Sequence, residues 1–326
     1  MDRTTAKKTI NQYGREKKAF LFIINFDLSN SWIKPLNEID NSDVLFNING
    51  HTNTSIKKVT LPEINFSKLP VKYEKYSEAF DIVLKNINWG NSYLTNLTQP
   101  TEINTNLNLR DIFHLSKAPY KLLFKDQFVV FSPEIFIKIS KGEISSYPMK
   151  GTIDADLPDA ENTLLNDLKE TAEHTTIVDL IRNDLSMVAS NVHVEKFRYM
   201  DKISTNQKNL LQMSSKIVGE LPEGFHNNLG DILFSLLPAG SISGAPKKKT
   251  IEIIQKAEQY SRGFYTGVMG IFDGENLDSA VMIRYIEKEG DNLTYKSGGG
   301  ITSFSDCQKE YTELIDKVYL PISPDK

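Results

Sequence analysis

Four short apolar runs follow one another closely in the middle of this chain, and they restrict the folds open to it. They are Tyr120 to Phe124, Phe128 to Phe131, Ile135 to Ile139 and Glu143 to Tyr147. All are rich in β-branched or aromatic residues, which favours strands. The links between them are too short for the crossover helix that parallel strands need. The runs therefore predict antiparallel pairing.

Further strands and helices alternate irregularly along the rest of the chain. Alternating or β-rich segments predict strands at 18–26, 43–49, 93–97, 192–199, 210–218, 265–272, 280–287 and 293–297. Apolar residues at helical spacing predict helices at 73–87, 159–187, 228–236, 246–260 and 306–318, whereas 50–68 is polar and predicts a loop. Without repeats or a linker, residues 1–326 are expected to form a single α+β domain with long antiparallel strands.

Charge and composition exclude several classes of function. The formal net charge is −4, so nucleic acid and anionic membranes are not expected as partners. No apolar run approaches the length that spans a membrane, and we expect a cytoplasmic protein. Cys307 is the only cysteine, which excludes a disulfide framework and a cysteine-rich metal site.

One lysine stands in a backbone of restricted shape. Lys150 lies two residues after Pro148 and directly before Gly151, so its amine is a candidate for an aimed nucleophile. An isolated Lys-Gly pair is more commonly a solvated surface charge. The functional interpretation therefore depends on the rest of the chain.

Two pairs of carboxylates have helical spacing. Glu170 and Glu173 are three residues apart, as are Glu310 and Glu313, so each pair shares one face of a predicted helix. Hard oxygen ligands from separate elements are what Mg²⁺ requires. Each pair alone is more often a solvated helix face, so the pairs need a recognisable framework to count as a metal site.

That framework is a series of segments that resembles the chorismate-utilising enzymes. The resemblance extends, in order, over SPE (132–134), YPMKGT (147–152), EHTTIVDLIRNDL (173–185), LPAGSISGAPK (237–247), RGFYTG (262–267), MIRY (282–285), SGGGI (297–301) and the segment 310–317. It implies antiparallel β-sheets that form a sandwich-like core with helices packed outside. It also implies a catalytic core over 89–320, preceded by an N-terminal portion, 1–88, shorter than is usual in the family.

Within this family the chain is similar to component I of aminodeoxychorismate synthase. The resemblance assigns Lys150 as a nucleophile that attacks C2 of chorismate while the C4 hydroxyl leaves. Ammonia then attacks C4 and expels the lysine, giving 4-amino-4-deoxychorismate for 4-aminobenzoate and folate synthesis. Splitting one difficult displacement into two is the physical advantage of covalent catalysis. Glu134 matches the family's acid/base carboxylate.

The resemblance also implies a substrate site and a metal site. Chorismate is a dianion, which Arg284, Tyr265 and Lys317 complement by charge or hydrogen bonding. The other residues assigned to substrate binding are Gly298, Gly299, Gly300, Ser243, Gln212 and Thr152. Mg²⁺ would bridge Glu173, Glu313 and a substrate carboxylate, with Glu170 and Glu310 beside them.

Other activities stay open as alternatives. Anthranilate synthases usually have alanine where this chain has Lys150. Isochorismate and salicylate synthases use a lysine to activate water; our alignment places Leu94 there, and leucine cannot activate water, which counts against hydroxide addition at C2. Gln212 replaces the family's histidine and cannot protonate a leaving hydroxyl, which leaves room for a non-catalytic chorismate-binding subunit. With no glutaminase cysteine, ammonia is expected from a separate glutamine amidotransferase subunit.

Overall fold

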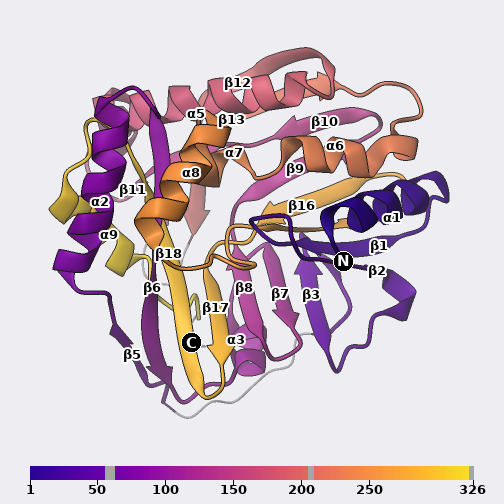
Figure 1. Cartoon of the computed structure of the whole chain (residues 1–326), viewed down its shortest axis with the longest axis horizontal. Helices are drawn as coiled ribbons and strands as arrows, with labels where there is room; N and C mark the ends of the chain where they lie inside the picture. The colour runs from indigo at the N-terminus through magenta and orange to yellow at the C-terminus, as the bar shows by residue number, and fades with distance from the viewer. Residues whose placement is uncertain (56–62, 205–208, 323–326) are drawn as a thin grey trace.

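A computed structural model describes residues 1–55, 63–204 and 209–322 of the chain. Its described residues form two antiparallel sheets of nine strands each, which pack against each other (Figure 1). Sheet A contains β1 (Phe20–Ile24), β2 (Ser31–Pro35), β9 (Ile135–Ser140), β10 (Glu143–Ser146), β11 (Met149–Asp154), β12 (Ser190–Ser204), β13 (Asn209–Glu220), β15 (Val268–Phe272) and β16 (Leu277–Val281). Sheet B contains β3 (Val44–Ile48), β4 (His51–Thr52), β5 (Phe66–Leu69), β6 (Leu94–Thr105), β7 (Tyr120–Phe124), β8 (Phe128–Ser132), β14 (Gly244–Ala245), β17 (Tyr285–Glu289) and β18 (Asn292–Ile301).

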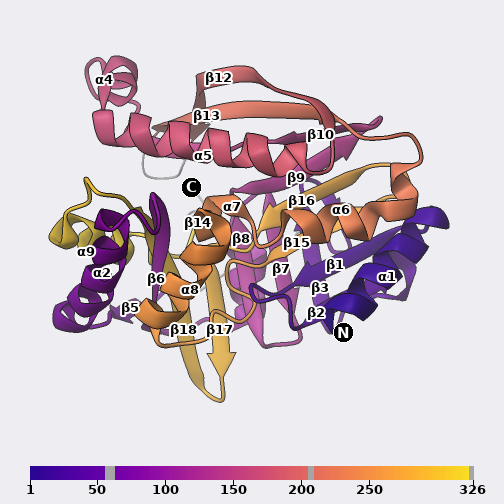
Figure 2. The same cartoon turned by 45° about the horizontal axis from the view of Figure 1, so that its top comes forward.

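The helices cover the outer faces and one end of the two sheets (Figure 2). They are α1 (Arg3–Arg15), α2 (Tyr73–Asn88), α3 (Leu109–Leu115), α4 (Ala160–Asn166), α5 (Leu168–Ser186), α6 (Leu229–Leu236), α7 (Gly240–Ser243), α8 (Lys247–Glu258) and α9 (Cys307–Asp316), with 3₁₀ turns η1 (Leu36–Glu38) and η2 (Phe225–Asn228). The α+β prediction of a sandwich with outer helices is confirmed.

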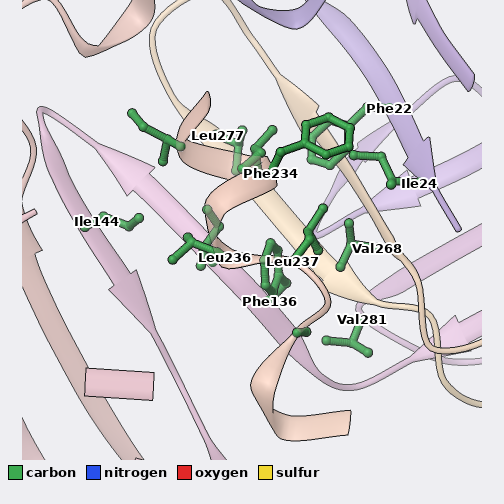
Figure 3. Packing of buried hydrophobic residues seen from close by; sticks show 14 of the residues in the cluster. Phe22, Ile24, Phe136, Ile144, Phe234, Leu236, Leu237, Val268, Leu277 and Val281 are labelled. Atoms are coloured by element: carbon green, nitrogen blue, oxygen red, sulfur yellow. The ribbon is translucent and has the colours of Figure 1, made fainter. Parts of the chain in front are cut away.

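Four apolar clusters hold these layers together. The cluster between the sheets joins β1, β15 and β16 to β3, β7 and β8, and includes Ile23, Phe46, Phe128 and Met269. A second cluster packs α1, α5 and α6 on the outer face of sheet A and includes Phe22, Phe136 and Phe234 (Figure 3). The other two lie under α3 and among α2, α8 and α9. Because strand side chains alternate between faces, β1 contributes to both sides of sheet A.

The N-terminal portion contributes strands to both sheets. β1 pairs with β15 on one side and β2 on the other, and all five of its residues are buried. β3 pairs with β7 in sheet B. Within residues 1–55 and 63–88, these strands are therefore built into the same sandwich as the later parts of the chain.

Several sequence predictions need correction at the level of elements. The predicted strand 280–287 is two strands in different sheets, β16 and β17, because the chain turns at Arg284, whose φ is 55°. The predicted loop 50–68 contains β4 and β5, although 56–62 lie outside the described residues. Helix α1 was not expected, because it is mostly polar and buries only Ala6, Ile10 and Gly14.

A buried ion pair ties sheet B to the helices beside it. The side chains of Glu258 in α8 and Arg262 are each 1% exposed, and the Arg262 Nε donates to Glu258 Oε2 over 2.8 Å. The guanidinium also donates to the backbone oxygens of Asn96 and Ile242. Strand β6 and the end of α7 are thus held by one cation.

Candidate active site

Lys150 lies where β11, α5 and β18 meet. Its Nζ lies 3.0 Å from Glu173 Oε2, and the Glu173 side chain is only 5% exposed. A Cβ at Gly300 would stand 2.8 Å from this amine and 3.4 Å from Glu173 Oε2. Glycine at this position therefore leaves the room that the Lys150–Glu173 pair occupies.

A second charged group lies beside Gly299. Lys317, just after α9, has its Nζ 2.6 Å from Glu313 Oε1 and 2.9 Å from the carbonyl oxygen of Gly298. A Cβ at Gly299 would lie 3.4 Å from Glu310 Oε2 and 3.9 Å from Glu313 Oε1. Neighbouring residues of a strand face opposite ways, so α9 approaches β18 from the side opposite to Lys150.

The electrostatics of Lys150 favour the ammonium form. Burial opposes the charge, but Glu173, with its hydrogen bond, Glu170 and Glu313 outweigh burial and raise the pKa of Lys150. Glu170 and Glu173 from one acidic pair and Glu313 from the other thus act on one cation. The carboxylate that accepts the hydrogen bond of Lys150 is Glu173.

Glu134 lies in the turn between β8 and β9, among cations. Its backbone NH donates to Ser132 Oγ over 3.0 Å, and its Oε1 accepts a hydrogen bond from Ser241. Burial raises the pKa of Glu134, while the Ser241 hydrogen bond and the charges of Lys150, Arg284 and Lys317 oppose that rise. A carboxyl group with a raised pKa is suited to act as an acid near neutral pH.

Arg284 and Tyr265 complete the cationic side of the site. The Arg284 Nε is buried and has no hydrogen-bond acceptor among the described residues. Burial raises the pKa of Tyr265, so its hydroxyl stays protonated as a donor. The two groups can therefore donate to an anionic ligand.

The remaining predicted site residues have mixed surroundings. Ser243 is buried and donates to the carbonyl oxygen of Ala239 over 3.0 Å, so its hydroxyl is engaged within the α7 loop. Gln212 pairs with Thr152 across β13 and β11; the side chain of Thr152 lies outside what the structure describes. Substrate contacts at these positions stay predictions.

The donor set around β18 has the chemistry that Mg²⁺ prefers, namely carboxylate oxygens. Within residues 1–55, 63–204 and 209–322, however, no three His, Cys, Asp or Glu side chains are close enough to hold a metal. The carboxylates are kept apart by the glycine run Gly298 to Gly300. Glu173 lies on the side that Gly300 faces, and Glu310 and Glu313 lie on the side that Gly299 faces. Magnesium stays a prediction.

Two contacts in this region were missed by sequence reasoning. One is the Ser241–Glu134 hydrogen bond. The other joins His174 Nε2 to Ser215 Oγ over 2.7 Å and ties α5 to β13. Burial, and secondarily the charges of Arg198 and Lys150, lower the pKa of His174 to about 4. The sequence segments that contain Glu134 and His174 were recognised, but only the packing reveals which serine hydroxyl each of these two side chains contacts.

Glycine is required where the α7 loop returns to sheet B. Gly244 has a φ of 114°, and a Cβ there would lie 1.9 Å from the carbonyl oxygen of Leu94. Any side chain would separate β14 from β6. The loop that carries Ser241 is thereby held close to the strand beside Gly300.

Two cavities lie near these residues. A cavity of about 20 Å³ lies behind Glu134 and is lined in part by Ser146, Asp184 and Ser241. A groove of about 850 Å³ follows the outer face of α5, where Thr176 and Arg182 line it. None of the predicted site residues lines the groove.

No helix of the described residues is both long and apolar enough to cross a membrane.

Comparison with known proteins agrees with this geometry. A model of the chorismate binding enzymes matches residues 8–323, and the chain belongs to that family. It is 53% identical to an uncharacterized PabA-like protein of Haemophilus influenzae, over 96% of this chain and 95% of that protein. It is 36% identical to anthranilate synthase component 1 of Aquifex aeolicus, over 62% of this chain and 42% of that enzyme.

The fold has solved counterparts. The menaquinone-specific isochorismate synthase of Escherichia coli superimposes with a TM-score of 0.75 at 16% identity, over 97% of this chain and 81% of that one. At this identity the likeness establishes the fold alone. The choice among chemistries must come from the site.

Proposed function

We propose that this chain is component I of an aminodeoxychorismate synthase, a transferase that converts chorismate and ammonia to 4-amino-4-deoxychorismate. The observation that carries the proposal is the position of Lys150, whose amine is held by Glu173 beside Gly300. Arg284, Lys317 and Tyr265 supply complementary groups for a dianion. The relative named PabA-like supports the same branch of the family.

In this mechanism Lys150 forms a bond to C2 of chorismate as the bond from C4 to its hydroxyl breaks. Glu134, whose pKa is raised by burial, donates the proton that lets the hydroxyl leave as water. Ammonia then bonds to C4, the bond from C2 to Lys150 breaks, and the ring double bonds return to their positions. The amine attacks only in its neutral form, so its extra proton must first pass to a base.

The proposal includes a magnesium ion, as the family resemblance implies. Glu173 and Glu313, with Glu170 and Glu310, would supply its oxygen ligands, although no three of these carboxylates are close enough among the described residues to hold it. Bound there, it would supply positive charge for a substrate carboxylate. The residues of the chain do the remaining work. Glu173 accepts the hydrogen bond of Lys150, and Ser241 fixes the carboxyl of Glu134.

Ammonia would come from a separate glutamine amidotransferase. The chain has one cysteine, Cys307, at the start of α9, and the sequence has no cysteine and histidine arrangement typical of a glutaminase. Ammonium salts should replace the partner in vitro. The proposed product would serve 4-aminobenzoate and folate synthesis in the cytoplasm.

One observation favours a second candidate, anthranilate synthase component I. The raised pKa of Lys150 and its pairing with Glu173 suit a lysine that is only a counter-ion. In that case the chain would release anthranilate and form no covalent adduct. The identity of the product separates the two candidates.

The test is to incubate the purified chain with chorismate, Mg²⁺ and ammonium at mildly alkaline pH and identify the product by mass and chromatography. We expect 4-amino-4-deoxychorismate from the wild type and almost none from Lys150→Ala. Lys138→Ala is the matched control, since that lysine pairs with Asp278 on sheet A, outside the site. Full activity of Lys150→Ala would remove covalent catalysis, and anthranilate as the product would favour the second candidate.

A further inference from the structure

The chain after α9 is fastened on both sides of Tyr319. Val318 is buried in the cluster under α3, and Leu320 packs against that cluster. The carbonyl oxygen of Pro321 accepts a hydrogen bond from Lys117 N over 2.9 Å, and Ile322 forms an antiparallel bridge with Ser116. The backbone around Tyr319 is therefore fixed on sheet B.

Tyr319 lies over the guanidinium of Arg284. The Arg284 Cζ is 5.5 Å from the centre of its ring. The residue as a whole is 44% exposed. One side of the ring thus covers the arginine and another meets solvent.

Arg284 differs from the other cations of the site. Lys150 and Lys317 each have a glutamate within 3.0 Å. Among the described residues the Arg284 Nε is buried and has no acceptor, and the groups that act most on this guanidinium are tyrosines and not carboxylates. An aromatic ring attracts a cation but leaves the in-plane N–H groups available to a ligand carboxylate.

We propose that Tyr319 is a positioning residue that holds the Arg284 guanidinium in the orientation that receives a carboxylate of the substrate. The inference rests on the proposed function, because it takes chorismate as the ligand. It adds a residue outside all the segments that carry the family resemblance, which end at Lys317. The ring acts through Arg284 and takes no part in bond formation.

The test is a double-mutant cycle read by direct binding. Chorismate is titrated calorimetrically, with Mg²⁺ and without ammonium, into the wild type, Tyr319→Ala, Arg284→Ala and the double variant. Loss of a partly desolvated cation–π contact should weaken binding by about tenfold in Tyr319→Ala. Tyr319→Phe, which keeps the ring, should recover most of that loss. In the Arg284→Ala background, Tyr319→Ala should have no further effect.

Trp89→Ala is the matched control. Trp89 is an exposed aromatic residue that stacks on Lys85 at 4.7 Å, at the end of α2. Its removal should leave chorismate binding unchanged. In steady-state assays Tyr319→Ala should raise KM and keep kcat within about twofold, which a general loss of folded protein would not do.

The outcomes separate this inference from the proposed function. Chorismate binding by the wild type together with unchanged binding by Tyr319→Ala overturns the role of Tyr319 alone. Losses that multiply in the double variant show that Tyr319 acts independently of Arg284, and also overturn it. No binding of chorismate by the wild type overturns both proposals.

Discussion

Replacing Glu258 with glutamine removes the negative charge that faces Arg262 in the interior. The carboxylate accepts hydrogen bonds from Thr98 N and Thr98 Oγ1, each over 2.8 Å, and from two nitrogens of Arg262. An amide of the same shape offers one acceptor oxygen and turns an NH₂ group toward these donors. The Glu258→Gln variant therefore keeps the volume and loses the compensation of a buried cation.

The expected cost is large. Losing one charge-assisted hydrogen bond costs about 1.5–3 kcal/mol, and breaking one side of a buried pair costs about 3–5 kcal/mol in total. Both side chains are 1% exposed, so solvent does not screen the charge that is left. We expect the free energy of unfolding to fall by about 3–5 kcal/mol, a large share of the ~5–15 kcal/mol typical of a folded protein.

Urea unfolding at neutral pH, followed by circular dichroism, measures this cost. The control is Glu252→Gln on the same helix, because Glu252 forms only an exposed pair with Lys249; its unfolding midpoint should not move. Glu258→Gln combined with Arg262→Gln should cost less than the sum of the two single changes. A midpoint for Glu258→Gln equal to that of the control, or strict additivity, would refute the reasoning.

Three further predictions concern the site. Gly300→Ala places a Cβ 2.8 Å from the Lys150 amine, so product formation should fall by about tenfold or more. The free energy of unfolding in urea should change by only about 1 kcal/mol, because the flexible lysine side chain can move aside. Unchanged turnover would contradict the predicted crowding of Lys150. Glu313→Gln should raise the Mg²⁺ concentration that gives half-maximal turnover, and an unaltered metal response would remove this carboxylate from the metal site. The pKa of His174 is about 4 in the folded protein and 6.5 in the unfolded chain. As the pH falls, the unfolded chain therefore binds the extra proton first. The contribution of His174 to the free energy of unfolding is full above pH 6.5 and decreases by up to about 3 kcal/mol toward pH 4. His174→Gln should flatten that part of the curve measured without metal, and a slope equal to that of the wild type would contradict the assignment.

The spacing of hydrophobic residues correctly predicted those helices and strands in which buried residues recur at a regular helical or strand interval. The hairpin of β7 and β8, helix α2 and helix α9 are confirmed close to their expected bounds. Helix α1 was missed because its thirteen residues bury little apolar surface of their own and depend on packing against α6. The division of 280–287 between two sheets was also not predicted. It depends on the left-handed backbone conformation of Arg284, which the spacing of hydrophobic residues does not indicate.

The site could be predicted only as far as motifs identify residues. The resemblance brought Lys150, Glu173 and Gly300 together, although local spacing relates none of them. The resemblance did not reveal which carboxylate pairs with Lys150, because that depends on the distances between charged groups in the folded chain. Tyr319 lies beyond the last recognised segment, and its contact with Arg284 depends on how the end of the chain crosses sheet B.

The place of β1 has a consequence for how the protein forms. Phe20 to Ile24 pair with the nearby strand β2 on one side, whereas their partners on the other side, Val268 to Phe272, follow only after more than two hundred intervening residues. Contacts so distant in sequence form slowly, and the edge of β1 that pairs with β15 stays unpaired until they do. The chain is thus expected to depend on protection during synthesis more than its final stability would suggest.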